Sequence, residues 1–373
     1  MSRMSAQRVT TILLIVITSS VLIFTFKSSS ISDQDRGKEP VNAPDLYEDE
    51  DQGNQGQEEK VMQRAEDIKV DDGHDIEVND GHDIKVNDGH DIEGDDRYDV
   101  EAVQFRRRQI LNQACNRLGQ NRNLPPVSWE TTVHFLASDK YRLLFCFAPK
   151  VSCTTWKSIM SALYQDDKRA KPGRFLKMNT IHDAYDVMRR WRNYAKVLFV
   201  REPLERALSA YLDKFVLGPE RASWERKFGS VMVKRYRNAS TDKLTYPFKT
   251  PIRFDEFIRF ITDNGPKATM TQQTDHWLPV SRFTSPCQID YTFLGHYETL
   301  QYDGPYVINH FNLSSVVTFP EVHSSRSRDR LVEAYAKVPT NLIHRLVDYY
   351  KMDYELFGYS ANEILDIILE GRR

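Results

Sequence analysis

The sequence has 373 residues, with 51 Lys and Arg against 53 Asp and Glu, so its formal net charge at pH 7 is only −2. That total conceals two oppositely charged parts: positions 41–100 hold 21 acidic and 5 basic residues, whereas positions 101–373 hold 29 acidic and 41 basic residues. The basic part favours anionic partners through long-range attraction. Because the N-terminal sequence directs the chain into the secretory route, nucleic acid is excluded as the partner, and an anionic nucleotide or an acidic glycan is favoured.

An uncharged run near the N-terminus predicts a membrane anchor. Residues 1–8 carry Arg3 and Arg8, and residues 9–26 contain no charge before Lys27. Such a run is just long enough to cross a bilayer as a helix, and cations on the short side favour a cytoplasmic N-terminus. The alternative is a cleavable signal peptide, which the length of the run and the lack of an A-x-A-like site disfavour. Both interpretations send the rest of the chain into the secretory route.

Residues 27–104 are predicted to form a disordered acidic stem, because few large apolar side chains are present to offset the entropy of ordering. They contain an eight-residue repeat: DIKVDDGH, DIEVNDGH, DIKVNDGH and the decayed DIEGDDRY. Its histidines, His74, His82 and His90, lie beside acids and suggest a metal site. The unit nevertheless lacks the EF-hand and nonapeptide calcium spacings, so we favour a solvated spacer.

Residues 105–373 suffice for one large domain, in which strand-like and helix-like runs alternate as in an α/β fold with a parallel sheet. The four cysteines are Cys115, Cys146, Cys153 and Cys287. They allow up to two disulfides in an oxidising compartment, and the sequence does not choose among the pairings. The sequons at Asn238 and Asn312 agree with secretion and are predicted glycosylation sites.

The stretch Tyr141–Tyr164 predicts a strand, an anion-binding loop and a helix. Leu143–Ala148 is almost wholly apolar, as in a strand covered on both faces, and Pro149 ends it. From Trp156 onward, apolar residues recur with the spacing of a helix that packs on such a sheet. The loop between them holds a cation and hydroxyls: Lys150, Ser152, Thr154 and Thr155. With the free N–H groups of the new helix, these residues make a seat for a phosphate.

A plainer interpretation of this stretch is an ordinary turn between a strand and a helix. In it, Thr154 or Thr155 is the N-cap and Lys150 is solvated. The spacing is not the Walker pattern, because no glycine precedes Lys150.

A second strand, loop and helix follow. Ala195–Val200 is another buried-strand run, Arg201 lies at its end, and Pro203 suits the first turn of a helix. The helix has one apolar stripe, with Gly218 as its stop: Leu204, Ala207, Leu208, Tyr211, Leu212 and Phe215. Because ligands bind where parallel strands end, Arg201 is a candidate ligand contact.

Two further polar residues, Arg206 and Ser209, lie off that stripe. The alternative to a ligand-binding role is an ordinary amphipathic helix with surface arginines. Two such loops, each with a cation and hydroxyls, suit a ligand that carries phosphates at two ends.

Here the sequence resembles a known family. APKVSCTTWK is similar to the 5′-phosphosulfate loop of Golgi carbohydrate sulfotransferases, and REPLERALSAYLDKF is similar to their 3′-phosphate motif. FRRRQILNQAC, DHWLP, PCQIDYTFLGHYETL and YYKMDYELFGY extend the likeness over about residues 105–360. It is strongest to the branch of HNK-1, chondroitin 4-O-, dermatan 4-O- and GalNAc-4-O-sulfotransferases. Thr155 replaces a common Asn, and Glu202 and Leu204 replace a common Asp and Phe.

The resemblance implies a P-loop-like sulfotransferase fold, a central parallel sheet flanked by helices, and 3′-phosphoadenylyl sulfate as the sulfate donor. The residues implied to wrap its 5′-phosphosulfate are Pro149, Lys150, Val151, Ser152, Cys153, Thr154 and Thr155. Arg201, Arg206 and Ser209 would hold its 3′-phosphate, and no metal is needed. Nothing in the sequence around Cys153 favours a catalytic thiol.

The acceptor hydroxyl needs a base, for which His276 in TDHWLP is the candidate and Lys150 the group that stabilises developing charge. A structural histidine beside Trp277 is the alternative, and weaker candidates for the base are His182, His296 and His323.

The predicted protein is thus a single-pass type II Golgi membrane enzyme that acts on a glycan, with position 4 of GalNAc in chondroitin or dermatan as the expected target. The alternatives are an HNK-1-type glucuronyl 3-O-sulfotransferase and a non-catalytic glycan-binding protein on a transferase scaffold. A kinase is disfavoured by the missing Walker glycines and the lack of a clear magnesium-binding Asp pair.

Overall fold

The computed structural model describes residues 98–119, 129–237, 244–264, 271, 273–321 and 327–371. The predicted anchor, the stem up to residue 97 and the sequon at Asn238 lie outside these ranges and stay predictions. Within the described ranges, no helix combines the length and the hydropathy that a bilayer span requires.

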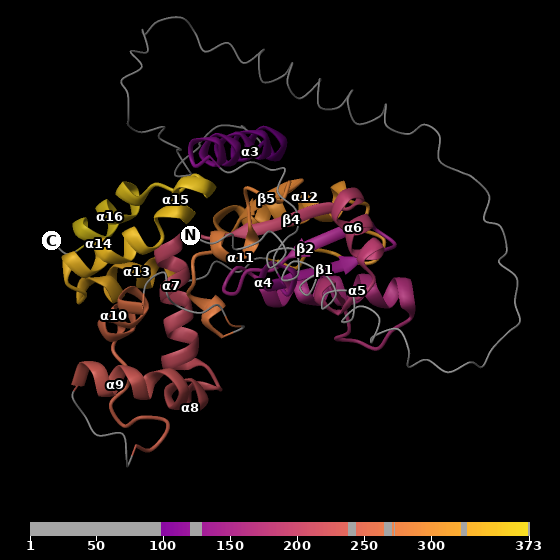
Figure 1. Ribbon diagram of the computed structural model, residues 1–373. Helices are drawn as coiled ribbons and strands as arrows, with labels where there is room; N and C mark the ends of the chain where they lie inside the picture. Colours follow the sequence, from indigo (N-terminus) through magenta and orange to yellow (C-terminus); the bar gives the residue numbers. More distant parts are fainter. Residues whose placement is uncertain are drawn as a thin grey trace, which may run out of the picture. The chain divides into compact units, whose positions relative to one another are not determined.

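A five-stranded sheet lies at the centre, in the order β3-β1-β2-β4-β5 (Figure 1). Its strands are β1 (Phe135–Ser138), β2 (Leu143–Cys146), β3 (Leu176–Lys177), β4 (Ala195–Val200) and β5 (Phe293–His296). The three strands β2, β4 and β5 are parallel, as expected, but β1 runs antiparallel to both β2 and β3. The prediction of a parallel sheet is therefore wrong at one edge. Only four residues join β1 to β2, too few for a crossover, so they form a hairpin.

The described helices are α3 (Val100–Arg117), α4 (Trp129–Thr132), α5 (Cys153–Lys168), α6 (Ala184–Asn193), α7 (Pro203–Tyr211), α8 (Arg221–Trp224), α9 (Ser230–Arg237), α10 (Phe254–Asn264), α11 (Ser281–Thr284), α12 (Leu300–His310), α13 (Ser327–Ala336), α14 (Thr340–Tyr349), α15 (Lys351–Phe357) and α16 (Ala361–Glu370). Shorter helical segments are the 3-10 turns η1 (Met178–Thr180), η5 (Thr274–His276) and η6 (Tyr297–Thr299) and the π-helical turns η2 (Leu212–Leu217) and η3 (Glu225–Gly229).

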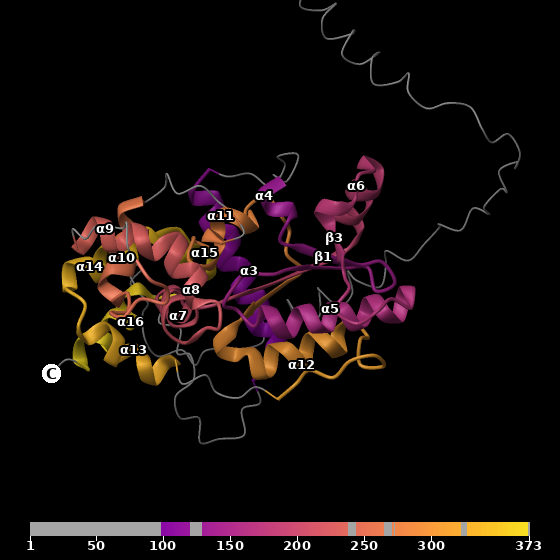
Figure 2. The ribbon, with the colours of Figure 1, turned by 90° about the horizontal axis from the view of Figure 1, so that it is seen from below.

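Helices cover both faces of the sheet. Trp156 of α5 stacks on Phe145 of β2 at 4.8 Å and packs on Phe199 of β4 at 4.9 Å between ring centroids. Phe135 faces the other side, because β strands alternate their side chains, and there it meets Trp191 of α6 at 4.7 Å. Figure 2 shows α5 and α6 on opposite sides of the strands. The resulting three-layer core confirms the α/β class.

Helix α3 closes the sheet edge that β5 would leave open. The Gln104 amide donates to the Leu294 carbonyl and accepts from the Leu294 N–H, both at 2.8 Å, as a neighbouring strand would. Arg107 donates to the same carbonyl and forms an ion pair with Asp303 at 2.7 Å. A sheet edge satisfied in this way is protected from pairing with another chain.

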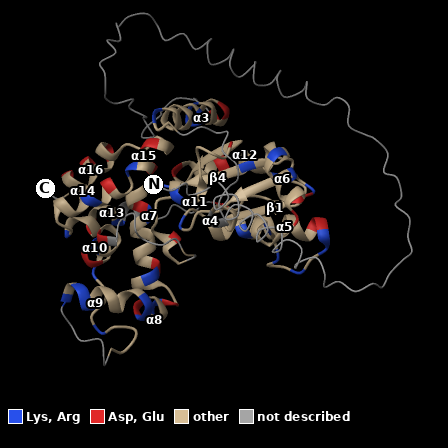
Figure 3. Ribbon diagram, viewed as in Figure 1, with Lys and Arg blue, Asp and Glu red and all other residues tan. Residues whose placement is uncertain are grey.

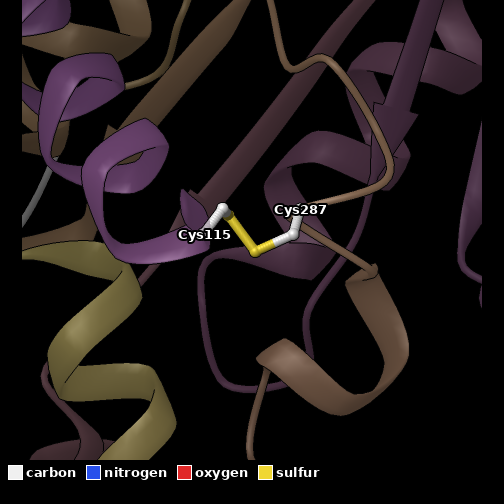
Figure 4. The surroundings of a disulfide bond; sticks show 2 residues. All are labelled: Cys115 and Cys287. Carbon is white, nitrogen blue, oxygen red and sulfur yellow. A yellow bond between two sulfur atoms is a disulfide. The ribbon is translucent and has the colours of Figure 1, made fainter. Parts of the chain in front are cut away.

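A disulfide holds the far end of α3. Cys115 is bonded to Cys287, which follows α11 (Figure 4). Cys146 and Cys153 are free thiols. Of the pairings that the sequence left open, the structure has a single disulfide, and it joins residues 172 positions apart.

A second apolar cluster lies beside the sheet and is built mainly from helices, with Phe248, Ile252, Trp277 and Val338 added from connecting segments. It includes Leu204 and Leu208 of α7, Phe257 of α10, Tyr335 of α13 and Ile343 of α14, all fully buried. The apolar stripe predicted for α7 is thus largely confirmed. Because α7 packs into this cluster, it is a rigid support for the loop that precedes it.

Candidate functional site

The two loops expected to bind anions lie against each other. Strands β2 and β4 are parallel neighbours, with Cys146 opposite Leu198, so both end at the same edge of the sheet. Arg201 Nη1, just after β4, donates to the Lys150 carbonyl, just after β2, at 3.3 Å. The fold therefore brings together the two predicted ends of one ligand site.

The first loop has a strained backbone and ends in a helix N-terminus. Lys150 and Ser152 have φ of 71° and 51°, in the left-handed region that non-glycine residues rarely adopt. Helix α5 begins at Cys153, and the Ser152 side chain makes no capping hydrogen bond. The plainer interpretation, in which Thr154 or Thr155 caps the helix, is wrong on this point, because the helix begins at Cys153 with Ser152 as its N-cap. Both threonines lie in the first turn, whose N–H groups lack acceptors within the helix and can bind an anion.

Lys150 is held by the continuation of the second helix. Its Nζ lies 3.1 Å from Asp213 Oδ2, and Lys214 Nζ lies at the same distance from that oxygen. Burial alone would raise the pKa of Asp213, but the two lysines lower it below its ordinary value. The Lys150 side chain is still 18% exposed, so it can contact a ligand.

Arg201 is almost enclosed. Its side chain is 3% exposed, pairs with Glu205 Oε2 at 3.2 Å and lies over the Tyr297 ring at 4.2 Å. The next residue, Glu202, caps α7 by accepting from the Glu205 N–H at 2.6 Å, and it also accepts from the Tyr354 hydroxyl at 2.6 Å. Burial raises the pKa of Glu202 to about 7, even though these hydrogen bonds oppose the rise.

Arg206 does not lie on the surface, contrary to the expectation for a residue off the apolar stripe. It is fully buried, and its guanidinium donates to three carbonyls: Pro149 at 3.1 Å, Leu278 at 2.7 Å and Asp275 at 2.6 Å. Charge-assisted hydrogen bonds to carbonyls explain how a buried arginine is tolerated. Arg206 thus ties the first loop to residues 275–278, while Ser209 is half-buried one turn further along.

That tie brings His276 near the first loop. His276 Nδ1 lies 2.9 Å from Asp275 Oδ1 and 3.1 Å from the Gln273 carbonyl oxygen. The side chain is 19% exposed, and its ring meets the edge of Trp224 at 5.2 Å. Because Lys214 Nζ lies 4.6 Å from the Trp224 ring, a chain of contacts leads from His276 back to Asp213 and Lys150.

The other candidate histidines are placed differently. His296 is buried against Tyr359, and burial lowers its pKa well below the ordinary value. His182 is exposed ahead of α6, and His323 lies outside the described residues. Among the candidates that the structure describes, only His276 lies in the segment that Arg206 ties to the first loop. Those described residues also contain no group of three His, Cys, Asp or Glu side chains arranged to hold a metal.

Comparison with known proteins decides the family. A profile described as the Sulfotransferase family matches residues 133–360, which include both loops and His276. The chain belongs to the sulfotransferase family. Carbohydrate sulfotransferase 14 of Danio rerio is 31% identical over 270 residues, covering 67% of this chain and 71% of that protein. The human protein of the same name is 32% identical over 266 residues, covering 68% of each. Carbohydrate sulfotransferase 10 of Xenopus laevis is 29% identical over 281 residues, covering 69% and 77%.

No solved structure matches this sulfotransferase. The family match makes the chain a sulfate-transferring enzyme with carbohydrate sulfotransferases as relatives, and the family implies 3′-phosphoadenylyl sulfate as co-substrate. A helix N-terminus beside a lysine fits a sulfate or phosphate group of such a donor.

Sequence reasoning missed several residues of this sulfotransferase site. Asp213 and Lys214 lie within a motif that the sequence singles out, so their place after the helix was a usable signal. Asp275 directly precedes His276 in the same way. His134 had no such signal, because it reaches Asp275 from 141 positions away.

Proposed function

We propose that this sulfotransferase moves sulfate from 3′-phosphoadenylyl sulfate to a sugar hydroxyl, with position 4 of GalNAc in chondroitin or dermatan as its target. The observation that carries the proposal is the contact between Arg201 and the Lys150 carbonyl. It joins two loops, each with a cation, at the carboxyl ends of adjacent parallel strands, where α/β folds bind their ligands.

The first loop would hold the 5′-phosphosulfate. The residues assigned to this contact are Pro149, Lys150, Val151, Ser152, Cys153, Thr154 and Thr155. The N–H groups of the first turn of α5 supply donors, and Lys150 exchanges its contact with Asp213 for one with the sulfuryl oxygens.

The second loop would hold the 3′-phosphate through Arg201 and Ser209. Arg201 is nearly enclosed, so a phosphate would share its N–H donors with the Lys150 carbonyl and Glu205 or displace one of them. Arg206 was assigned to the same phosphate from the resemblance. Its three carbonyl partners support a different assignment, in which Arg206 holds the first loop in place through the Pro149 carbonyl.

The transfer is an in-line displacement at sulfur. The acceptor hydroxyl oxygen forms a bond to sulfur as its proton passes to His276, and the bond from sulfur to the bridging phosphate oxygen breaks. The products are the sugar sulfate and 3′,5′-adenosine bisphosphate. Lys150 would stabilise the charge that develops on the bridging and leaving oxygens. His276 supplies the base at a partly exposed position.

A basic segment beside His276 favours a polyanionic acceptor. Residues 221–237 carry six cations and one acid, Glu225, which is buried and pairs with Arg221. Arg226 and Lys227 are exposed, and Lys227 Nζ donates to Gln273 Oε1 beside His276. Figure 3 shows blue cations along α8 and α9. Arg235 and Arg237 pair with Asp263 and Glu256, so the exposed Arg226 and Lys227 carry the argument for a uronate-bearing chain over a short neutral glycan.

The test is sulfate transfer by the full-length protein. We would incubate it with labelled donor and a panel of desulfated chondroitin, desulfated dermatan and a glucuronyl-terminated HNK-1-type acceptor, then locate the new sulfate by disaccharide analysis. The proposal expects sulfate at position 4 of GalNAc. Label on glucuronic acid position 3 would favour the HNK-1-type alternative, and glycan binding without transfer would favour the non-catalytic alternative.

We further propose that residues 9–26 anchor the enzyme in the Golgi membrane with residues 105–373 in the lumen. The disulfide between Cys115 and Cys287 supports an oxidising compartment. Protease added to intact vesicles should leave the catalytic part whole, and digestion without detergent would reject this orientation.

A further inference from the structure

One buried carboxylate lies between two histidines at the site. Asp275 is 3% exposed; its Oδ2 lies 3.1 Å from His134 Nε2, and its Oδ1 lies 2.9 Å from His276 Nδ1. His134 is 1% exposed and stacks on Phe283 at 4.5 Å. The three side chains come from the segment before β1 and from η5, far apart in sequence, so the fold itself assembles the group.

The backbone of Asp275 is also fixed. Its carbonyl accepts from Arg206 Nη2 at 2.6 Å, and its N–H donates to the Thr271 carbonyl at 3.1 Å. The same arginine binds the Pro149 carbonyl. Arg206 therefore fixes the position of Asp275 relative to the loop assigned to the sulfate donor.

The neighbours of His276 decide which ring nitrogen carries its proton. Nδ1 faces the Asp275 carboxylate and the Gln273 carbonyl, and both of these groups are acceptors only. A proton on Nδ1 is donated to the Gln273 carbonyl and lies within ion-pair distance of Asp275 Oδ1, which leaves the lone pair on Nε2. A neutral imidazole that is to accept a proton at Nε2 needs this tautomer.

We propose that Asp275 is a positioning residue that, together with the Gln273 carbonyl, holds His276 as the Nδ1–H tautomer, with His134 donating to the second oxygen of the same carboxylate. The inference rests on the proposed function, because it assigns how His276 is held for proton abstraction. When Nε2 takes the proton of the sugar hydroxyl, the imidazolium forms beside a carboxylate that stays ionised. Burial alone would raise the pKa of Asp275, but the two histidines lower it to about 2.

Other charges face this group and remain in place in every variant below. Arg206 lies against the Asp275 carbonyl, Lys227 contacts Gln273, and Lys214 lies over the Trp224 ring that meets His276. All three are cations, while the acids beside them, Glu220 on Trp224 and Asp213 on Lys214, reach His276 only through those residues; Asp275 contacts the imidazole directly.

The decisive experiment compares Asp275→Asn with Asp166→Asn in the full-length protein. Asp166 is a matched control, because its carboxylate accepts from Lys140 and Tyr141 on the surface at 2.6 and 2.7 Å, away from this group. We would measure kcat and KM against pH, with labelled donor and desulfated chondroitin.

For Asp275→Asn we expect kcat to fall by about 10²-fold, the lower end of a lost general base, with the donor KM unchanged. An amide can donate to Nδ1 and so favour the wrong tautomer. We also expect the acid limb of the profile to move to lower pH, because the imidazolium loses its anionic neighbour. Asp275→Glu should recover part of the loss. A wild-type kcat, or a fall in kcat with an unmoved acid limb, would overturn the proposal.

A second measurement needs no variant of Asp275. In the wild-type protein labelled with ¹⁵N-histidine, the His276 ring signals are identified by their loss in His276→Gln. Above the acid limb, Nδ1 should be protonated and Nε2 unprotonated, and the reverse would overturn the proposal. This readout does not depend on turnover. If no glycan accepts sulfate, the proposed function fails while the tautomer still tests the role of Asp275.

Discussion

Lys150 Nζ lies 3.1 Å from Asp213 Oδ2. The lysine of the first loop is therefore paired with η2, the π-helical turn that continues α7, the helix after the second loop. Arg201 also donates to the Lys150 carbonyl, so Lys150 is bound to the second strand–loop–helix segment through both its side chain and its backbone. A bound donor must compete with Asp213 for the lysine. In the absence of donor, the contact with Asp213 keeps Lys150 close to the place where the sulfuryl group is proposed to lie.

Lys150→Ala should lower kcat by about 10²–10³-fold, as does loss of one preorganised donor to a developing negative charge. The side chain is partly exposed, so the fold should persist. The control is Lys140→Ala, which breaks another lysine–aspartate pair, with Asp166 at 2.6 Å on the surface. Such an exposed pair is screened by water and contributes little, so this variant should keep its activity and stability. Equal turnover in the two variants would refute the role of Lys150.

Arg206→Ala should destabilise the fold by about 3 kcal/mol or more. It leaves three buried carbonyl acceptors without their donor, and each such loss costs about 1–3 kcal/mol before relaxation. Urea unfolding measures the loss.

Arg201→Ala should instead weaken retention on immobilised 3′,5′-adenosine bisphosphate. The assignments would be reversed if Arg206→Ala unfolded like the wild type and Arg201→Ala bound the nucleotide fully.

The central strands were predictable because each is a short, almost wholly apolar run followed by a break. Leu143–Ala148 and Ala195–Val200 both contain strands, and their parallel pairing put the two loops at one edge. The apolar stripe of α7 predicted its packing for the same reason. Strand β1 escaped prediction because its antiparallel direction depends on the length of the turn to β2.

The polar interior was harder to predict. Arg206 is polar and lies off the apolar stripe, and only the three carbonyls of distant segments make its burial favourable. His134 meets Asp275 through tertiary folding, which no local pattern encodes. Similarly, the N-cap at Ser152 depends on left-handed backbone at a non-glycine residue, which propensities disfavour.

Asn312 should carry an N-linked glycan when the protein passes through a secretory compartment. The residue is exposed in a left-handed turn after α12, Ser314 is exposed beside it, and Leu313 between them is buried. An exposed turn presents the amide to the glycosylation enzyme. Peptide N-glycosidase should increase gel mobility, and Asn312→Gln should remove one step of that shift. An unchanged ladder in Asn312→Gln would show the site to be empty.

Glu202 should make the enzyme lose stability as pH rises toward neutrality. Burial raises its pKa from 4.5 to about 7 in the folded state, so the unfolded chain releases this proton more readily than the folded chain does. The contribution is therefore fully present below about pH 4.5 and is lost progressively up to about pH 7, in total about 3 kcal/mol.

Glu202→Gln isolates this effect, because an amide keeps an acceptor for the Glu205 N–H but does not titrate. The free energy of unfolding in urea, measured at intervals from about pH 5 to about pH 8, should decline more steeply in the wild type than in Glu202→Gln. The low pKa of Asp275 acts in the opposite direction, but its window lies between its ordinary value of 3.8 and about 2. The two carboxylates therefore do not mask each other. Parallel slopes in the two proteins would mean that Glu202 is ionised in the folded enzyme across this range.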